Sequence, residues 1–351
     1  MKGRIRQGEL EMDNKITTLL AIKYPIIQAP MAGVTTPEFV SAAAEAGMLG
    51  SIGAGYLSAE ATRQFIREVK ERTEKPFAVN LFVPENVKVD QPYLREAYEA
   101  LQPIGKQLGM PFWKAPLSEP EFDEQIRVVV EEGVKICSFT FGLPDEVTIR
   151  LLKEHDVYLI GTATTVEEAK LAEQAGMDAV VAQGSEAGGH RGSFSGELTF
   201  IPLQELLAAI VASVQIPVIA AGGIATKEGM DHALAAGAQA VQIGTILLAA
   251  EESGAHPVYK QAVLEADEGC TVFTKAFSGK TARGIRNQFM MDMKEAIIAP
   301  YPYQNDLTKE IRKAAAQQGK RDFISLWAGE SVHLSREGTI KEILAQLIHP
   351  L

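Results

Sequence analysis

The sequence predicts an α/β fold, a (β/α)8 TIM barrel with an additional, mostly helical lobe over its mouth. Three observations predict this fold. Apolar runs alternate with segments of helical periodicity along the chain. The runs end in glycine or a small polar residue. Most runs begin about 22 to 28 residues after the previous one, which is the length of one strand, one helix and two short loops.

Eight apolar runs are predicted to form the barrel strands. Each run is continuous rather than alternating, as expected of parallel strands buried on both faces. The runs are Ile26–Ala32, Leu49–Gly55, Phe77–Val83, Val134–Gly142, Val157–Ala163, Ala179–Gly184, Pro217–Gly223 and Ala240–Ile246. A doubly wound open sheet is the competing architecture, but the first run does not lead into the G-x-G-x-x-G turn of a dinucleotide-binding unit.

Glycines predict the ends of three helices between these strands, at Gly47, Gly176 and Gly237. Glycine is favoured at such positions because it adopts the left-handed conformation without a steric penalty. Two intervals between strands are longer than the others. The interval that begins at Phe77 is predicted to hold an excursion beside the barrel, and the interval that begins at Ala179 holds a glycine-rich loop.

Four segments follow from these patterns. Residues 1–13 are a polar N-terminal extension, and residues 14–250 form the barrel. Residues 251–321 are predicted to form the helical substrate lobe over the barrel mouth. Residues 322–351 end in "TIKEILAQLIHPL", whose apolar spacing predicts a final helix that packs back onto the barrel.

Composition indicates a globular protein that acts on small molecules. The chain has 351 residues, of which 46% are hydrophobic and 23% charged. Lys and Arg number 34 against 45 Asp and Glu, a net charge of −11, and the basic residues are scattered. Nucleic acid and anionic membranes are therefore not expected as partners. We expect a monomer or a homodimer.

Cysteine usage and the absence of an apolar leader predict a cytoplasmic protein. Cys137 and Cys270 are too few for a disulfide framework and lack the spacing of metal ligands, so no metal site is predicted. The N-terminal residues have no apolar core of the kind a signal peptide needs. No segment reaches the roughly 18 uninterrupted apolar residues of a membrane span.

The loops after the last two predicted strands predict a phosphate site. Phosphate is often held there in barrels of this type, by backbone N–H groups near a helix start. The loops are "AAGGIAT", with Gly222 and Gly223, and "QIGT", with Gly244 and Thr245. The alternative is that these glycines only form tight turns.

Amides at two other strand ends predict that the phosphate belongs to flavin mononucleotide (FMN). Asn80 and Gln183 each present a donor and an acceptor, which suits the edge of a heterocycle. Met31 in "QAPMAG" places a soft side chain where it can lie against an aromatic ring. The segment "AQGSEAGGHRGSF" then delivers one imidazole, His190, directly after glycines that allow close approach of the backbone. A lone histidine can also be purely structural.

The ordered set of motifs resembles the nitronate monooxygenases, formerly called 2-nitropropane dioxygenases. The motifs are "IIQAPMAG", "NLFVP", "AQGSEAGGHRG", "AAGGIAT", "QIGT" and "SGKTARGIRNQF". The resemblance implies a barrel that binds FMN without a covalent bond and oxidises alkyl nitronates such as propionate 3-nitronate with O2, yielding a carbonyl compound and nitrite or nitrate. By motif it implies His190 as the catalytic residue and FMN contacts at Met31, Asn80, Gln183, Gly188, Gly223, Gln242, Gly244 and Thr245.

A basic loop and two tyrosines are weaker candidates for the substrate site. "SGKTARG" and the residues after it carry Lys280, Arg283 and Arg286, which form either a lid that attracts an anion or a solvated turn. Tyr301 and Tyr303 either close the pocket with their hydroxyls or pack the lobe.

Three alternatives stay open. Two of them are an FMN-dependent enoyl-acyl-carrier-protein reductase and an NAD(P)H:quinone reductase. These families resemble the chain in the same motifs but use NAD(P)H. A non-redox barrel acting on a sugar phosphate would need a lysine or paired acids at strand ends, and no lysine follows any predicted strand. The "FSGKTARGIRNQFM" segment favours the nitronate oxidation.

Overall fold

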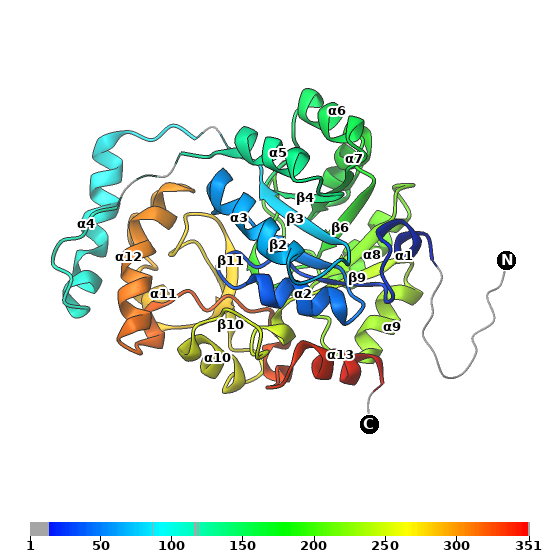
Figure 1. Ribbon diagram of the computed structural model, residues 1–351. Coiled ribbons are helices and arrows are strands. Elements are labelled where there is room, and N and C mark those ends of the chain that lie inside the picture. Colours follow the sequence, from blue (N-terminus) through cyan, green and yellow to red (C-terminus); the bar gives the residue numbers. More distant parts are fainter. Residues whose placement is uncertain (1–13, 86, 116, 118, 350–351) are drawn as a thin grey trace.

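Eight parallel strands form the centre of the molecule (Figure 1). The computed structural model describes residues 14–349 except residues 86, 116 and 118, so the predicted extension 1–13 lies outside the described residues. All eight predicted strands are confirmed, with shorter bounds. They are β1 (Ile26–Gln28), β2 (Gly50–Gly53), β3 (Phe77–Phe82), β4 (Ile136–Thr140), β5 (Tyr158–Ala163), β6 (Ala179–Gln183), β8 (Val218–Ala221) and β9 (Ala240–Ile243).

The strands close into a ring. Their order is β1-β9-β8-β6-β5-β4-β3-β2, and every neighbouring pair is parallel. A parallel bridge between Ile27 and Leu49 joins β1 to β2 and completes the circle. The predicted (β/α)8 barrel is therefore confirmed.

Two apolar layers hold the barrel. Strand residues that point inward pack with Ile16 and Leu20 of α1 (Lys15–Leu20), which thereby closes the amino-terminal end of the ring. Strand residues that point outward pack against the surrounding helices. These are α2 (Pro37–Glu45), α3 (Ala59–Lys70), α5 (Phe122–Glu131), α6 (Glu146–Glu154), α7 (Val166–Ala175), α8 (Leu203–Val211), α9 (Lys227–Ala235) and α13 (Ile340–Ile348).

The predicted helix ends are confirmed by backbone geometry. Gly47, Gly176 and Gly237 have φ values of 95°, 94° and 105°, in the left-handed region that side chains disfavour. Each follows α2, α7 or α9 within two residues. Turns of this kind send the chain back toward the next strand.

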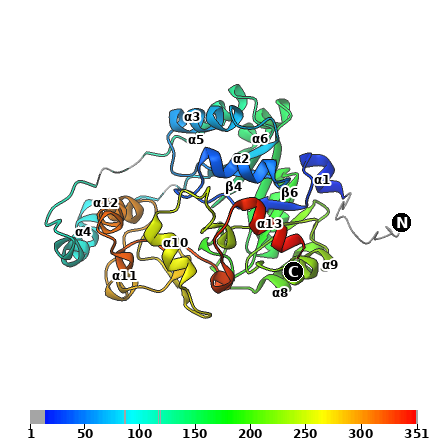
Figure 2. The same cartoon turned by 60° about the horizontal axis from the view of Figure 1, so that its bottom comes forward.

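A second body of helices lies beyond the carboxyl ends of the strands. It contains α10 (Pro257–Leu264), α11 (Gln288–Asp292), α12 (Tyr303–Gln317) and the 3-10 turns η2 (Arg321–Phe323) and η3 (Glu330–Leu334). The excursion after β3 folds as α4 (Gln91–Gln107), which lies beside α12 in both views (Figures 1 and 2). Apolar side chains of α4 and α12 share one buried cluster.

A three-stranded sheet joins this lobe to the barrel, and the sequence did not predict it. Its order is β10-β11-β7, with β7 (Gly189–His190), β10 (Thr271–Thr274) and β11 (Ala282–Ile285) all antiparallel. Strands of two to four residues are too short to show a period. At the chain end, α13 packs against α2, α9 and the 3-10 turn η1 (Thr245–Leu247).

Candidate active site

A cavity opens at the carboxyl ends of the barrel strands. It lies where βα loops gather in barrels of this type, and it is walled by loops after most of the strands together with the C-terminal segment. All the predicted catalytic and cofactor-binding residues line it, namely Met31, Asn80, Gln183, Gly188, His190, Gly222, Gly223, Gln242, Gly244 and Thr245. The fold therefore brings together residues more than 200 positions apart in the chain.

The walls of this cavity carry no formal charge. Among the described residues that line it there is no Asp, Glu, Lys or Arg, and the side chains that can titrate are His190, Tyr56 and Tyr259. An anion bound here must be stabilised by N–H and O–H donors.

The two glycine loops present backbone at the cavity edge. Gly222 and Gly223 follow β8 with φ values of 119° and 70°, so a side chain at either position would be strained. Gly244 follows β9, and a Cβ there would lie 3.1 Å from Ala29 Cβ. Thr245 Oγ1 accepts a hydrogen bond from Gly329 N at 3.0 Å, which leaves its hydroxyl proton free to be donated. These groups suit a phosphate.

The C-terminal segment completes the cavity, and sequence reasoning missed it. Trp327, Gly329 and Ser331 line the cavity beside the glycine loops. Ser331 Oγ donates to Gly223 O at 2.7 Å and so fixes the first loop. A Cβ on Gly188 would lie 2.5 Å from Gly329 N, so the two glycines pack backbone to backbone. No local motif marks "WAGES", since its role depends on a contact with a distant loop.

The two predicted amides are partly engaged by the protein itself. Asn80 Nδ2 donates to Ser138 Oγ at 3.0 Å and to Thr140 Oγ1 at 3.1 Å, bonds that leave its oxygen unused. Gln183 Nε2 donates to His190 O at 3.0 Å, and Gly192 N donates to Gln183 Oε1 at 2.8 Å. Gln183 thus also holds the segment that carries the histidine.

Two further contacts orient His190. Its strand β7 pairs with β11, where Ala282 lies opposite His190. Its Nε2 lies 2.7 Å from Ser278 Oγ. The Ser278 hydroxyl donates to Lys280 O at 3.1 Å, so the neutral imidazole gives its Nε2 proton to Oγ and keeps Nδ1 as the acceptor. Ser278 opens the motif "SGKTARGIRNQF", but the sequence did not predict its contact with His190, which lies 88 positions away.

Burial keeps the His190 imidazole neutral. Burial, followed by the nearby charges of Lys280 and Arg312, lowers its pKa to about 3. The rings of Trp327 and Phe141 lie 5.3 Å and 5.7 Å from it, centroid to centroid. The accessible surface of His190 therefore faces the cavity between aromatic walls rather than bulk water.

Two tyrosines lie side by side near the cavity. Tyr301, from the segment before α12, lies 6.4 Å from the His190 ring and 6.4 Å from the ring of Tyr56, centroid to centroid. The two tyrosine hydroxyls are hydrogen-bonded to each other, and Tyr56 is 41% exposed. Tyr56 lines the cavity and was missed from the sequence, where it follows β2 without a motif.

None of the predicted substrate residues is among the residues that line the cavity, and this includes Tyr301. The Lys280 ammonium is ion-paired with Glu85 and sits 4.5 Å from the centroid of the Phe141 ring, behind the aromatic wall. Arg283 pairs with Glu330 at 2.8 Å and is buried. Arg286 is exposed.

Tyr303 also serves the lobe rather than the cavity lining. Its hydroxyl donates to Val87 O at 3.2 Å and ties the start of α12 to the segment before α4. The two tyrosines of "APYPYQN" therefore take different positions, and only Tyr301 approaches His190.

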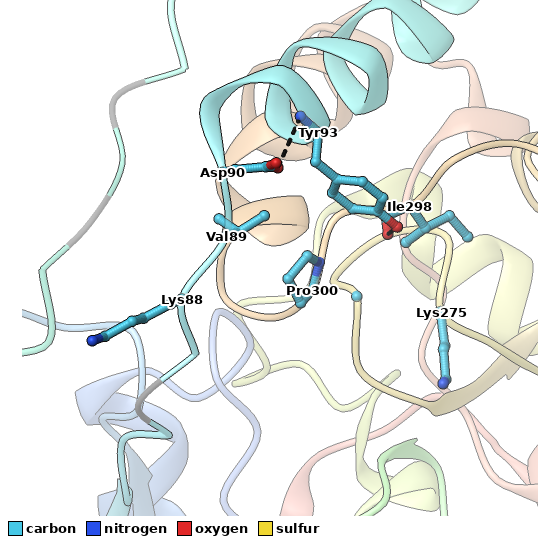
Figure 3. A pocket seen from close by; sticks show the side chains of 8 residues that line it. Lys88, Val89, Asp90, Tyr93, Lys275, Ile298 and Pro300 are labelled. Atoms are coloured by element: carbon cyan, nitrogen blue, oxygen red, sulfur yellow. Dashed lines mark hydrogen bonds between the residues drawn. The ribbon is translucent and has the colours of Figure 1, made fainter.

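A second hollow lies under the start of α4 (Figure 3). Tyr93 crosses it and donates from its hydroxyl to Ile298 O at 3.2 Å, beside Pro300. The ammonium groups of Lys88 and Lys275 point away from each other (Figure 3). Because its polar groups do not converge, this hollow lacks the character of a small-molecule site.

The described residues contain no arrangement of three or more His, Cys, Asp or Glu side chains suited to a metal ion. Within the same residues, no helix is both long and apolar enough to cross a membrane. Cys137 is buried in β4, and burial raises the pKa of its thiol, which makes it unreactive.

Comparison with known proteins gives concordant similarities. The model of the nitronate monooxygenase family matches residues 13–350. A "Probable nitronate monooxygenase" of Staphylococcus haemolyticus is 45% identical and covers 96% of both chains. Another from Staphylococcus saprophyticus is 44% identical over 96% of this chain and 98% of its own.

Solved structures are similar over nearly the whole chain. Nitroalkane oxidase from Streptomyces ansochromogenes aligns with a TM-score of 0.89 and 36% identity, covering 95% of this chain and 98% of its own. FabK from Thermotoga maritima aligns with a TM-score of 0.76 and 33% identity, covering 95% of this chain and 94% of its own.

Proposed function

The chain belongs to the nitronate monooxygenase family and is an oxidoreductase, and from this premise we propose that it uses bound FMN to oxidise alkyl nitronates with molecular oxygen. One observation carries the proposal. The cavity at the carboxyl ends of the strands combines a backbone cradle for a phosphate, amides for a heterocycle and one neutral imidazole, within walls free of formal charge.

The cavity residues fit FMN. Gly222, Gly223 and Gly244 with the Thr245 hydroxyl would hold the phosphate, because side chains are absent where it must approach the backbone. Asn80 and Gln183 would bond the edge of the ring system, each with an atom that can still accept or donate.

Met31, Gly188 and Gln242 complete the proposed lining along the ring and its tail. When bound, FMN accepts electrons from the substrate and passes them to oxygen.

The imidazole of His190 supports a nitronate rather than a neutral nitroalkane as the substrate. A base with a pKa of about 3 removes a carbon-bound proton poorly near pH 7. A nitronate is already deprotonated, so no base is required. Its negative charge next to His190 raises the pKa of the imidazole and favours an imidazolium that stabilises the anion. We therefore assign His190 the role of holding the nitronate group.

Propionate 3-nitronate is the proposed substrate type, and the proposed products are a carbonyl compound with nitrite or nitrate. The rings of Trp327, Phe141 and Tyr301 surround His190 and would shield a substrate held there from water. Tyr56 also lines the cavity.

A second candidate is reduction of enoyl thioesters with NAD(P)H. The similarity to FabK favours it, since that structure shares the fold over 95% of this chain. The two functions predict different second substrates for the same cavity.

Purified protein tests both proposals. We expect a yellow protein whose released flavin co-elutes with FMN, and oxygen consumption with propionate 3-nitronate that exceeds oxidation of NADH. A colourless protein would remove the flavin proposal. Rapid NADH oxidation with an enoyl thioester, without oxygen consumption on the nitronate, would assign the reductase instead.

A further inference from the structure

We infer that Glu168, a buried carboxylate outside the cavity, is the positioning residue that anchors the segment carrying His190. The inference rests on the proposed function for the role of His190. It concerns a side chain that lies on the first turn of α7, behind the end of β5, and that the proposed chemistry does not otherwise use.

Both oxygens of Glu168 are saturated with hydrogen bonds to two different loops. Oε2 accepts from Thr164 N at 2.6 Å and from Thr164 Oγ1 at 2.8 Å, at the end of β5. Oε1 accepts from Phe194 N at 2.6 Å and from Ser195 N at 3.0 Å, just past His190. The Glu168 side chain is 0% exposed, so water cannot replace these bonds.

These bonds fix one end of the short segment that contains His190. Gln183 holds its middle through His190 O and Gly192 N, and a Cβ on Gly192 would lie 2.7 Å from Thr162 Cγ2. Gln183 and Thr162 both line the cavity. Releasing the Glu168 end would let the segment lift away from the cavity floor and would move the imidazole with it.

A charge of opposite sign accompanies this carboxylate. Arg191 is 1% exposed and donates from Nη1 to Gln183 O at 3.1 Å. Burial lowers the pKa of Arg191 to about 10, and the charges of Glu168 and Glu186 oppose that shift. The carboxylate of Glu168 thus also balances a buried guanidinium one residue from His190.

The chain provides a matched control on the same helix. Glu173 of α7 accepts two consecutive backbone N–H bonds as well, from Gln215 at 2.6 Å and Ile216 at 3.1 Å. Those residues precede β8, at the opposite end of the barrel from the cavity. Both bonds go to Glu173 Oε1, so Glu173→Gln can keep them through its amide oxygen. The variant removes the same negative charge from α7 without touching the His190 segment, and it therefore controls for the loss of charge.

The first experiment compares Glu168→Gln with Glu173→Gln in the flavin-loaded protein. Hydrogen exchange of the 190–196 backbone should accelerate at least tenfold in Glu168→Gln and stay unchanged in Glu173→Gln. Turnover of the nitronate should fall about tenfold in Glu168→Gln, mainly in kcat with KM within twofold, because misplacing a reacting group costs rate rather than binding. Equal behaviour of the two variants in exchange and turnover would overturn the inference.

The second experiment combines Glu168→Gln with His190→Asn. If Glu168 acts through His190, the loss from Glu168→Gln should shrink to less than twofold in the His190→Asn background. Additive losses would show that Glu168 stabilises the fold without positioning His190. Hydrogen exchange needs no substrate, so failure of the nitronate assay in the unmodified protein would count against the proposed function and not against this anchor.

Glu168→Asp covers the case in which Glu168→Gln does not fold. It keeps the charge beside Arg191 but is one methylene too short to reach both loops. For Glu168→Asp we expect a hydrogen-exchange rate of the 190–196 backbone and a kcat that both lie between the values of the unmodified protein and those of Glu168→Gln. If both quantities equal those of the unmodified protein, the inference is contradicted.

Discussion

At the residue scale, the surroundings of His190 determine what it can do. An exposed imidazole would exchange protons near neutral pH. Here aromatic walls and two cations hold the pKa at about 3, and Ser278 selects the tautomer. In the absence of a ligand, the side chain is therefore a neutral ring whose Nδ1 can accept a hydrogen bond.

This low pKa predicts acid sensitivity that depends on His190. The unfolded chain binds a proton at this imidazole below about pH 6.5, whereas the folded chain does so only near pH 3. The contribution of the neutral His190 to the free energy of unfolding is therefore fully present above pH 6.5. It is lost as the pH falls from about 6.5 toward 3. His190→Asn should therefore reduce the loss of unfolding free energy between pH 7 and pH 5 by up to about 2 kcal/mol, measured by urea denaturation.

His333→Asn is the control for this prediction, because His333 is exposed. Its unfolding free energy should follow that of the unmodified protein at both pH values. An unchanged pH dependence in His190→Asn would show that the imidazole is solvated in the folded state.

At the element scale, the lobe is assembled from helices that are distant in the chain. α4 precedes the fourth barrel strand, yet it packs on α12 and shares its apolar cluster. The Trp113 indole donates to Leu307 O at 3.0 Å and adds a polar tie between the two segments. Since Tyr301 lies two residues before α12, we expect the packing of α4 to support the position of Tyr301 near His190.

Leu101→Ala in α4 should reveal this support. Leu101 is 0% exposed within the lobe cluster, so truncation should cost about 3 kcal/mol in unfolding free energy. Lys106→Ala, at an exposed position of α4, should stay within about 0.5 kcal/mol. Urea denaturation of both variants measures the difference. A cost below about 1 kcal/mol for Leu101→Ala would mean that α4 is held only loosely.

The three-stranded sheet is the second element that matters for the site. β11 of the lobe pairs with β7, so the lobe and the barrel meet at the backbone of His190 itself. Arg283 reinforces the junction by pairing with Glu330 of η3. Arg283, which was predicted as a substrate ligand, is thus buried at this junction, where its Nε also donates to Ser185 O at 2.9 Å.

At the scale of the whole molecule, the cavity is lined by residues from nearly the full length of the described chain. Its walls include Met31 after the first strand and Ser331 before the last helix. A ligand that bridges these loops stabilises only the folded chain, by mass action.

FMN should therefore raise the melting temperature of flavin-free protein more than riboflavin does. At about 100 times its dissociation constant a ligand adds about 2.7 kcal/mol to stability. Riboflavin lacks the phosphate that the Gly222 to Thr245 loops are proposed to hold, so it should add less at equal concentration. Differential scanning fluorimetry with each compound gives the comparison. Equal shifts for both would argue against the phosphate cradle.

Much of the fold followed from local pattern, whereas part of the site did not. Continuous apolar runs and glycine stops determined the eight strands and three helix ends, because such signals depend only on neighbouring residues. Motifs at strand ends identified residues that line the cavity, since all strand ends of a parallel barrel face one side. The roles of those residues stay predictions until a ligand is tested.

Tertiary structure alone decided the rest. Trp327 and Tyr56 lack any local signal. Ser278 stands in the motif "SGKTARGIRNQF" and Glu168 in the first turn of a helix, but no local pattern shows the contacts that they make with the His190 segment, which is adjacent to them only in the folded chain. The low pKa of His190 arises in the same way, from burial that no single segment provides. The physical reason is that hydrophobic periodicity reflects only neighbouring residues in the sequence. Contacts between loops form only when the closed barrel and its lobe place distant segments next to each other.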